Sequence, residues 1–398
     1  MAWCGVALVV NWVQQVTYHA THPPGGGRFR PLPGWFEASA GRIAWDAGLY
    51  LRVAQYGYRP AEQLEAGFPA YALAIRTGRV LGMDPQTAAV LVSMASGLAA
   101  AVLCWRWCEQ RGLDLSARRT ALALVLLYPY AFMVFGVAYS DPLLLALVLG
   151  TAVLAESGRW TLAGLVGGLA TATRPTGLVV VPFLVVLVLE RTGALVVPTT
   201  LPGGGAWRGR LRASWTTLRG IRLRRGRLRP AHAAVLLSLW GIAAYMVFLA
   251  RRTGNPFYFW SVQDSGYGHG GLLDPRTWLK VSFLELPGLE VHHVGDVLNE
   301  LAATVVFAGA VLVAPAVGRR FGRGYTVLVW VLALMVWVFD RWLAPGGRYF
   351  LPAVPFVAAW AAPSLARRPA LRTGVLVAFG ASSLALAAGF AGLFDLHW

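Results

Sequence analysis

Long apolar runs recur along the whole chain and constrain its fold more than any other feature of the sequence. A transmembrane helix needs about 20 mainly apolar residues, and only 13% of this 398-residue chain is charged, against about 25% in soluble domains. We predict about eleven spans, at approximately 3–19, 86–106, 120–138, 142–156, 160–173, 176–190, 231–251, 300–317, 325–343, 348–364 and 373–393. The sequence therefore predicts an all-α, polytopic integral membrane protein.

Basic residues are unevenly placed between these runs, and their placement predicts the topology. The net charge is +17, and the densest basic stretch lies between two apolar runs, at Arg208, Arg210, Arg212, Arg219, Arg222, Arg224, Arg225, Arg227 and Arg229. Cytoplasmic loops are enriched in Lys and Arg, which assigns to the cytoplasm the connections 107–119, 157–159, 191–230, 318–324 and 365–372, with the N-terminus on the same side. Because the charge follows this topology, we expect anionic membrane lipids and not nucleic acid as its partner.

The same topology leaves two long loops on the outer face, residues 20–85 and 252–299. The acidic residues concentrate there, at Glu37, Asp46, Glu62, Glu65, Asp84, Asp264, Asp274, Glu285, Glu290 and Asp296. A transporter keeps ionisable residues at mid-membrane and often shows an internal repeat, and we find no convincing repeat. We therefore interpret residues 1–398 as one transmembrane domain whose two outer loops form the roof of an active site.

An acid flanked by aromatic residues stands out in the first outer loop. If residues 41–55 form a helix, Asp46 and Tyr50 share one face, since residues four apart are neighbours, and Asp46 lies in the first turn, where the helix dipole favours a carboxylate. An amphipathic helix bordered by Trp45 and Tyr50 suits a membrane interface. The pattern is equally compatible with a catalytic carboxylate and with an interfacial anchor in which Asp46 only caps the helix.

Cofactor signatures are weak. Cys104 and Cys108 have no further Cys or His at ligand spacing, so a zinc site or disulfide framework is not expected. His292 and His293 are adjacent loop residues, which rarely converge on one metal ion. The sequence has no Asp-x-Asp, Gly-rich phosphate loop or dinucleotide fingerprint. We expect no cofactor and no metal.

Several motifs, in order, resemble those of one enzyme family. They are Trp45-Asp46-Ala47-Gly48-Leu49-Tyr50 with Gly57-Tyr58, then Gly67-Phe68-Pro69-Ala70-Tyr71, Tyr128-Pro129-Tyr130, Tyr139-Ser140-Asp141, Ala172-Thr173-Arg174-Pro175-Thr176-Gly177, Thr253-Gly254-Asn255-Pro256-Phe257 with Gln263, and Arg348-Tyr349-Phe350-Leu351-Pro352-Ala353-Val354-Pro355. Together they resemble the GPI mannosyltransferase II family and its bacterial relatives, which belong to the GT-C superfamily of integral-membrane glycosyltransferases. Asp141 and Asn255 depart from the Glu and Asp usual in that family.

The resemblance implies transfer of mannose from a polyprenyl-phosphate donor to a glycolipid or envelope-glycan acceptor, without nucleotide, at the outer face of the membrane. The membrane would be a bacterial plasma membrane or, in a eukaryote, that of the endoplasmic reticulum. An acceptor hydroxyl needs a general base, and the resemblance implies Asp46 for that role, with Glu37, Glu62 and Glu65 as fallbacks.

The leaving phosphate needs positive charge and hydrogen-bond donors. Arg348 beside Tyr349 is the first candidate, although it could instead be an interfacial arginine that extends its charge to water. Arg174 is the second, with a structural ion pair to Asp141 or Asp46 as its competing role. Trp45, Tyr50, Tyr58, Phe68, Tyr139 and Asp141 are expected to shape the sugar site.

Three other readings remain, one of them a non-catalytic membrane scaffold, in which Asp46 and Arg348 would lie far apart and face solvent. Within the enzyme class, the sugar could be arabinose or glucose. In a different class, the chain could be a transporter or flippase for a lipid-linked sugar, for which Arg174 is the residue of interest.

Overall fold

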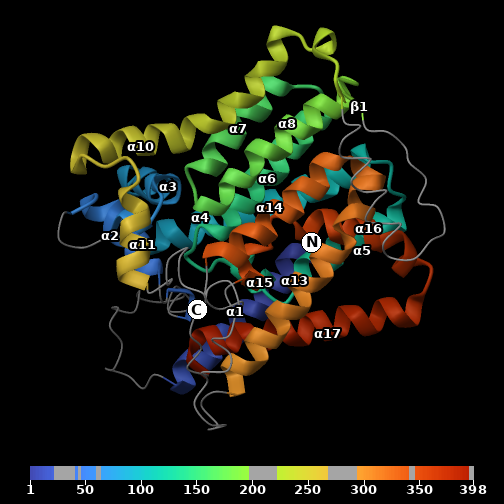
Figure 1. The fold of residues 1–398 in the computed structure, drawn as a ribbon. Helices are drawn as coiled ribbons and strands as arrows, with labels where there is room; N and C mark the ends of the chain where they lie inside the picture. The colour runs from blue at the N-terminus through green and yellow to red at the C-terminus, as the bar shows by residue number, and fades with distance from the viewer. Residues whose placement is uncertain are drawn as a thin grey trace.

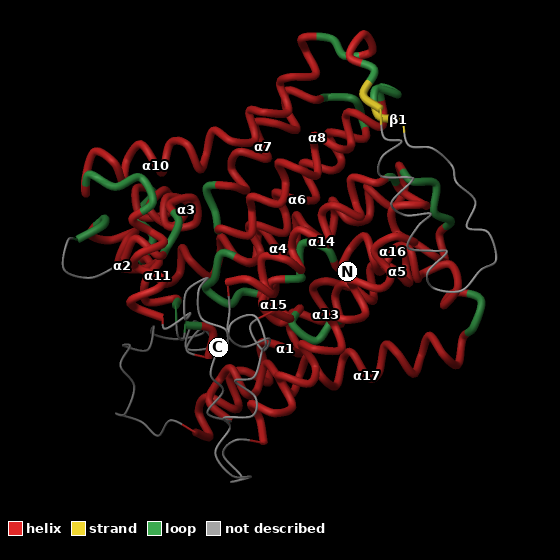
Figure 2. Tube along the Cα trace, viewed as in Figure 1, coloured by secondary structure: helices red, strands yellow, loops and turns green. Residues whose placement is uncertain are grey.

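The computed structural model describes residues 1–21, 41–43, 46–59, 64–196, 222–267, 294–339 and 346–393, and in these ranges the chain is almost entirely helical (Figure 1, Figure 2). The first helices are α1 (Ala2–Thr21), α2 (Ala47–Tyr56), η2 (Leu64–Ala66), α3 (Pro69–Val80), α4 (Pro85–Gln110), α5 (Leu115–Leu127), η3 (Ala131–Phe135), α6 (Asp141–Glu156), α7 (Trp160–Thr171), η4 (Pro175–Val179) and α8 (Val180–Arg191). The later ones are η5 (Arg225–Arg227), η6 (Pro230–Leu239), α10 (Trp240–Thr253), α11 (Tyr258–Tyr267), α13 (Val294–Phe321), α14 (Arg323–Phe339), α15 (Gly346–Tyr349), α16 (Val354–Ala366), α17 (Pro369–Ala388) and η9 (Gly389–Leu393). Strands β1 (Leu195–Val196) and β2 (Arg222–Leu223) pair antiparallel.

Four of the described helices are long and apolar enough to cross a membrane. They cover Pro85–Gln110, Pro230–Thr253, Asn299–Phe321 and Pro369–Gly392. Shorter apolar helices cover Trp160–Thr171, Arg323–Val338 and Val354–Ala366. The prediction of a largely helical membrane protein is confirmed in this coarse form, whereas the predicted number of spans is not confirmed.

The predicted continuous span 120–138 is wrong. α5 ends at Leu127, and the chain continues through η3 before α6 begins. Pro129 has no backbone N–H and disfavours helical backbone at the residue before it, which accounts for the end of α5. After η3, Gly136 takes a φ of 114°, a conformation open to glycine at little cost.

A second predicted span, 348–364, is also divided. The structure places Arg348 in the single-turn helix α15, and α16 begins only at Val354. Pro352 lies in the turn between the two helices, where it cannot donate the hydrogen bond that a continuous helix requires. The consequence is that Arg348 does not open a long span but ends a short helix that packs inside the protein.

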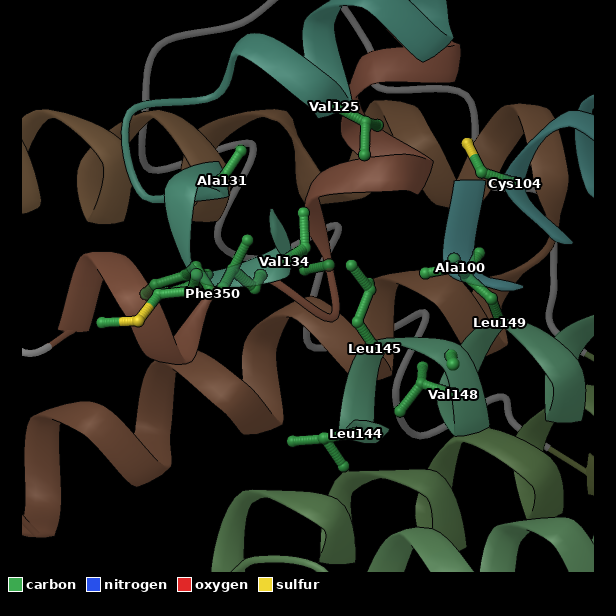
Figure 3. Packing of buried hydrophobic residues seen from close by; sticks show 14 of the residues in the cluster. Ala100, Cys104, Val125, Ala131, Val134, Leu144, Leu145, Val148, Leu149 and Phe350 are labelled. Carbon is green, nitrogen blue, oxygen red and sulfur yellow. The ribbon is translucent and has the colours of Figure 1, made fainter. Parts of the chain in front are cut away.

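Helix α6 is the centre of the packing, with α4 and α7 along it and α8 beside it. Figure 3 shows its apolar side chains among those of the neighbouring helices; the labelled ones are Leu144, Leu145, Val148 and Leu149, all buried. α6 runs from Asp141 to Glu156, so its rise of 1.5 Å per residue separates the two carboxylates by about 22 Å. The two ends of α6 consequently form two distinct charged regions.

The C-terminal end of α6 is tied to three other helices through Glu156. The Glu156 carboxylate pairs with Arg111, the residue that follows α4, at 3.0 Å and with Arg191 of α8 at 2.8 Å. It also accepts a hydrogen bond from the Tyr325 hydroxyl of α14 at 2.7 Å. Trp107 donates to the same hydroxyl at 2.8 Å. These residues lie in or beside connections that we predict to be cytoplasmic.

A separate aromatic cluster lies where η2, α10 and α11 meet, close to α2 and α3 (Figure 1). It is built from the buried residues Phe68, Ile242, Tyr245, Leu249 and Phe259, with Tyr58 packed against them. α3 begins at Pro69, the first helical position, where proline is well tolerated. This cluster fixes the first outer segment against α10.

Candidate active site

Most of the residues singled out from the sequence meet at the N-terminal end of α6. Asp46 precedes α2, Tyr139 and Asp141 flank the start of α6, Arg174 connects α7 to η4, and Arg348 and Tyr349 end α15. Four segments that are distant in the sequence therefore contribute to one site. Trp45 lies outside the described residues, as do Glu37 and Glu62.

The helix predicted over 41–55 begins later than expected, at Ala47. The preceding residues are held by tertiary contacts instead. The Arg42 carbonyl accepts a hydrogen bond from the Ala138 N–H at 2.9 Å, and a Cβ on Gly41 would lie 2.8 Å from the Gln14 carbonyl oxygen of α1. Gly41 and Arg42 therefore pack against α1 and against the segment before α6, and they do not form the first turn of α2.

Asp46 is consequently the N-cap residue of α2 and not a first-turn residue. Its half-buried side chain makes no capping hydrogen bond, so the carboxylate does not cap α2. Its backbone N–H donates to the Tyr139 hydroxyl at 2.9 Å. This bond ties the start of α2 to the residues that lead into α6.

Asp141 and Arg174 form a buried ion pair between Oδ2 and Nη1. Asp141 is 4% exposed and Arg174 is 9% exposed. Of the two partners considered for Arg174 from the sequence, the structure therefore selects Asp141. Removing one member of such a pair leaves an uncompensated buried charge, so each side chain fixes the other in place.

Arg348 is almost fully buried, at 3% exposed, which argues against an interfacial arginine reaching toward water. Its guanidinium carbon lies 5.2 Å from the centroid of the Tyr139 ring and 5.1 Å from that of Tyr349, and its Nη2 donates to the Tyr349 hydroxyl at 3.3 Å. Nε and Nη1 have no partner among the described residues. Buried polar groups are usually hydrogen-bonded, so these two donors are available to an incoming acceptor.

Electrostatics joins these groups into one cluster. The carboxylates of Asp46 and Asp141 both attract the Arg348 guanidinium, while Arg348 and Arg174 repel each other. The Arg174 guanidinium also lies 5.1 Å from the Tyr349 ring. Two cations and two carboxylates thus share a poorly hydrated region, where such interactions are stronger than in water. We call these four residues the Asp46–Arg348 cluster.

Tyr50 links α2 to α6 on another side of this cluster. Its hydroxyl hydrogen-bonds the Ser140 hydroxyl at 2.8 Å, and its ring packs edge-on against Tyr71. Burial raises the pKa of Tyr50, so the phenol stays protonated at neutral pH. Ser140 is a site neighbour that we did not select from the sequence, although it stands inside the Tyr139-Ser140-Asp141 motif.

Tyr58 and Phe68 lie in the aromatic cluster beside α10, next to the buried carboxylate of Glu65. The Tyr58 hydroxyl donates to the Gly67 carbonyl at 2.7 Å. Glu65 is 1% exposed, and its Oε1 lies 3.8 Å from Nε of Arg252. Nothing in the local sequence distinguishes Glu65 from the other loop acids, because its burial depends on packing against α10.

No group of three or more His, Cys, Asp and Glu side chains that could hold a metal ion occurs in the part of the chain that the structure describes. His292 and His293 lie outside that part.

Comparison with known proteins agrees with the sequence motifs. Residues 69–218 match the model of glycosyltransferase family 87, a range that includes Asp141 and Arg174. The chain is also 34% identical over 155 residues to the GPI alpha-1,6-mannosyltransferase 2 of Cricetulus griseus, an alignment that covers 36% of this chain and 31% of that protein. The resemblance to GPI mannosyltransferases is thereby confirmed.

Among solved structures, ArnT from Cupriavidus metallidurans bound to undecaprenyl phosphate is similar with a TM-score of 0.52 and 15% identity, over 95% of this chain and 62% of that one. The fold is therefore similar to that of ArnT. The apo oligosaccharyltransferase of Archaeoglobus fulgidus aligns with a TM-score of 0.48 and 12% identity, over 100% of this chain and 56% of that chain. The chain spans about a third of the curated relative and less than two thirds of either solved structure.

Proposed function

We propose that this chain is an inverting membrane glycosyltransferase that transfers mannose from a polyprenyl-phosphate carrier to a glycolipid or envelope-glycan acceptor at the outer face of the membrane. The observation that carries the proposal is the Asp46–Arg348 cluster, in which two carboxylates and two buried arginines from distant segments interact. The matches to family 87 and to a mannosyltransferase support the reaction and the sugar. The undecaprenyl phosphate bound to ArnT supports the carrier class.

In the proposed reaction, the Asp46 carboxylate accepts the proton of the acceptor hydroxyl as its oxygen attacks the anomeric carbon of mannose. The new bond joins that oxygen to that carbon, and the bond from the carbon to the phosphate oxygen breaks. The phosphate leaves with the electron pair of the broken bond. Attack on the side opposite to the leaving group inverts the configuration at the anomeric carbon.

The arginines would stabilise the departing phosphate. Arg348 has two donors without a partner, and a guanidinium suits the oxygens of a phosphate because its N–H groups form a planar fork. Arg174 is already paired with Asp141, so its proposed contribution is a fixed positive charge beside Arg348. Tyr50, Tyr58, Phe68, Tyr139 and Trp45 would bound the sugar.

The test compares wild type with Asp46→Asn in proteoliposomes. Transfer of radiolabel from polyprenyl-phosphate mannose into the glycolipid fraction is measured, at equal amounts of folded protein. Loss of a general base typically costs 10²- to 10⁴-fold in rate, and we expect a loss in that range. Glu109→Gln, which alters a carboxylate that is 61% exposed, is the matched control and should transfer at the wild-type rate.

Other outcomes would contradict specific parts of the proposal. Full activity of Asp46→Asn would contradict the assignment of the base. Absence of transfer from both proteins, with movement of the lipid-linked sugar across the bilayer, would contradict the enzyme and favour a flippase. Direct use of GDP-mannose without any lipid carrier would contradict the donor.

A further inference from the structure

Arg42 is a buried cation without an anionic partner. It is 7% exposed, and within the described residues its guanidinium has neither a carboxylate nor a hydrogen-bond acceptor; its Nε is fully enclosed without a partner. Burial lowers the pKa of Arg42 to about 10, which still leaves the side chain charged at neutral pH. A buried, uncompensated charge is costly for the folded protein, so this position calls for an anion.

The surrounding backbone holds Arg42 in place. The Arg42 carbonyl accepts from the Ala138 N–H. A Cβ on Gly136 would lie 3.3 Å from Nη1 of Arg42 and 3.0 Å from the Met94 side chain, so the guanidinium rests against a residue that has no side chain. A preorganised guanidinium loses little freedom when it binds a ligand.

A second buried, unpartnered polar side chain belongs to α1, the helix that approaches the segment containing Arg42. Gln14 is 0% exposed, and both its Nε2 and Oε1 lack a partner among the described residues. Its backbone carbonyl approaches Gly41, the residue before Arg42. Gln14 lies seven residues before the end of α1, about 10 Å along the helix axis, in the half of α1 that leads toward the predicted outer face.

This position is distinct from the Asp46–Arg348 cluster. Nη1 of Arg42 lies against Gly136 and the Met94 side chain, whereas the Arg348 guanidinium lies against the rings of Tyr139 and Tyr349. We propose that Arg42 and Gln14 bind the phosphate group of a lipid at a second position, separate from the Asp46–Arg348 cluster. A membrane supplies such a phosphate in two forms, a phospholipid headgroup and a polyprenyl phosphate, and a guanidinium suits both.

The test measures binding and not transfer, so it does not depend on the proposed reaction. Purified full-length protein in neutral detergent is titrated with phosphatidylglycerol, polyprenyl phosphate or inorganic phosphate, and native mass spectrometry reports the bound molecules and their affinities. For Arg42→Gln we expect a 10- to 100-fold weaker affinity for at least one of the two lipids, which corresponds to the loss of a charged hydrogen bond. Whichever lipid is affected identifies the source of the phosphate.

Two further variants keep the test decisive. Arg76→Gln removes an exposed arginine of α3 and should bind every probe as wild type does. Gln14→Leu tests the same site and leaves the charge of Arg42 in place. If Arg42→Gln does not fold, Gln14→Leu should still weaken the affinity for at least one of the two lipids. Wild-type affinities for both lipids in Arg42→Gln and Gln14→Leu would overturn the proposal, as would an effect confined to inorganic phosphate.

Discussion

At the scale of single residues, Tyr139 connects the two functional parts of the candidate site. Its hydroxyl accepts the hydrogen bond of the Asp46 N–H at 2.9 Å, and its ring lies 5.2 Å from the Arg348 guanidinium carbon. The base and the phosphate-binding arginine of the proposed reaction are therefore positioned by one side chain. Removing only the hydroxyl separates these two contributions.

We predict that Tyr139→Phe lowers the rate of mannose transfer by about 10-fold, because the Asp46 N–H loses an acceptor worth about 1 kcal/mol and Asp46 is less well positioned. The measurement is kcat and KM in proteoliposomes, with the loss expected in kcat. Tyr325→Phe is the control, since it removes a buried hydroxyl that donates to Glu156 at the other end of α6. Equal rates in Tyr139→Phe and wild type would show that the hydroxyl does not position the base.

Several of these residues could be selected from the sequence, but their partners could not. Asp46, Arg174 and Arg348 stand out because a charged residue beside apolar runs needs a reason to be there. That Arg174 pairs with Asp141, and that Tyr139 reaches Asp46, depends on how α2, α6 and α7 pack. Arg42 was not selected, since its burial is set by α1 and by the turn at Gly136.

At the scale of helices, close packing depends on small residues in α7. A Cβ on Gly164 would lie 2.2 Å from the Ala234 carbonyl oxygen of η6, and one on Gly168 would lie 1.9 Å from Nε1 of Trp240. Glycines four residues apart allow two membrane helices to approach closely. The sequence predicts helices in this region. It does not predict the breaks at Pro129 and Pro352, because the predicted spans 120–138 and 348–364 are each apolar enough to be continuous.

We predict that Gly164→Ala destabilises the protein by about 1–3 kcal/mol, because the added methyl group must displace the backbone of η6. The unfolding midpoint in detergent measures this effect. Gly309→Ala in α13 is the matched control, since no atom of the described residues beyond its own helical turn lies within 4 Å of its Cβ position; there we expect an unchanged or slightly higher midpoint. Identical midpoints for Gly164→Ala and wild type would mean that η6 can move away without cost.

At the scale of the whole molecule, α6 separates a stabilising cluster from the candidate active site. Asp141 starts the helix at the site, and Glu156 ends it about 22 Å away, where it holds Arg111, Arg191 and Tyr325 together. The likeness to the structure of ArnT covers 95% of the chain, so this division lies within a shared fold. It predicts that stability and catalysis can be changed independently from the two ends of α6.

Glu156→Gln tests this division. The glutamine retains an acceptor for the Tyr325 hydroxyl, but it leaves Arg111 and Arg191 without their carboxylate. Because Glu156 is 6% exposed and the arginines are 18% and 34% exposed, we expect a loss on the order of 2 kcal/mol, below that of a fully buried pair. The unfolding midpoint should fall, while the transfer rate per folded molecule stays at the wild-type value.

Glu109→Gln, which breaks the exposed pair with Arg118, should change neither quantity. A variant at Glu156 that unfolds like wild type but transfers slowly would contradict the separation, and would place the far end of α6 in the catalytic machinery.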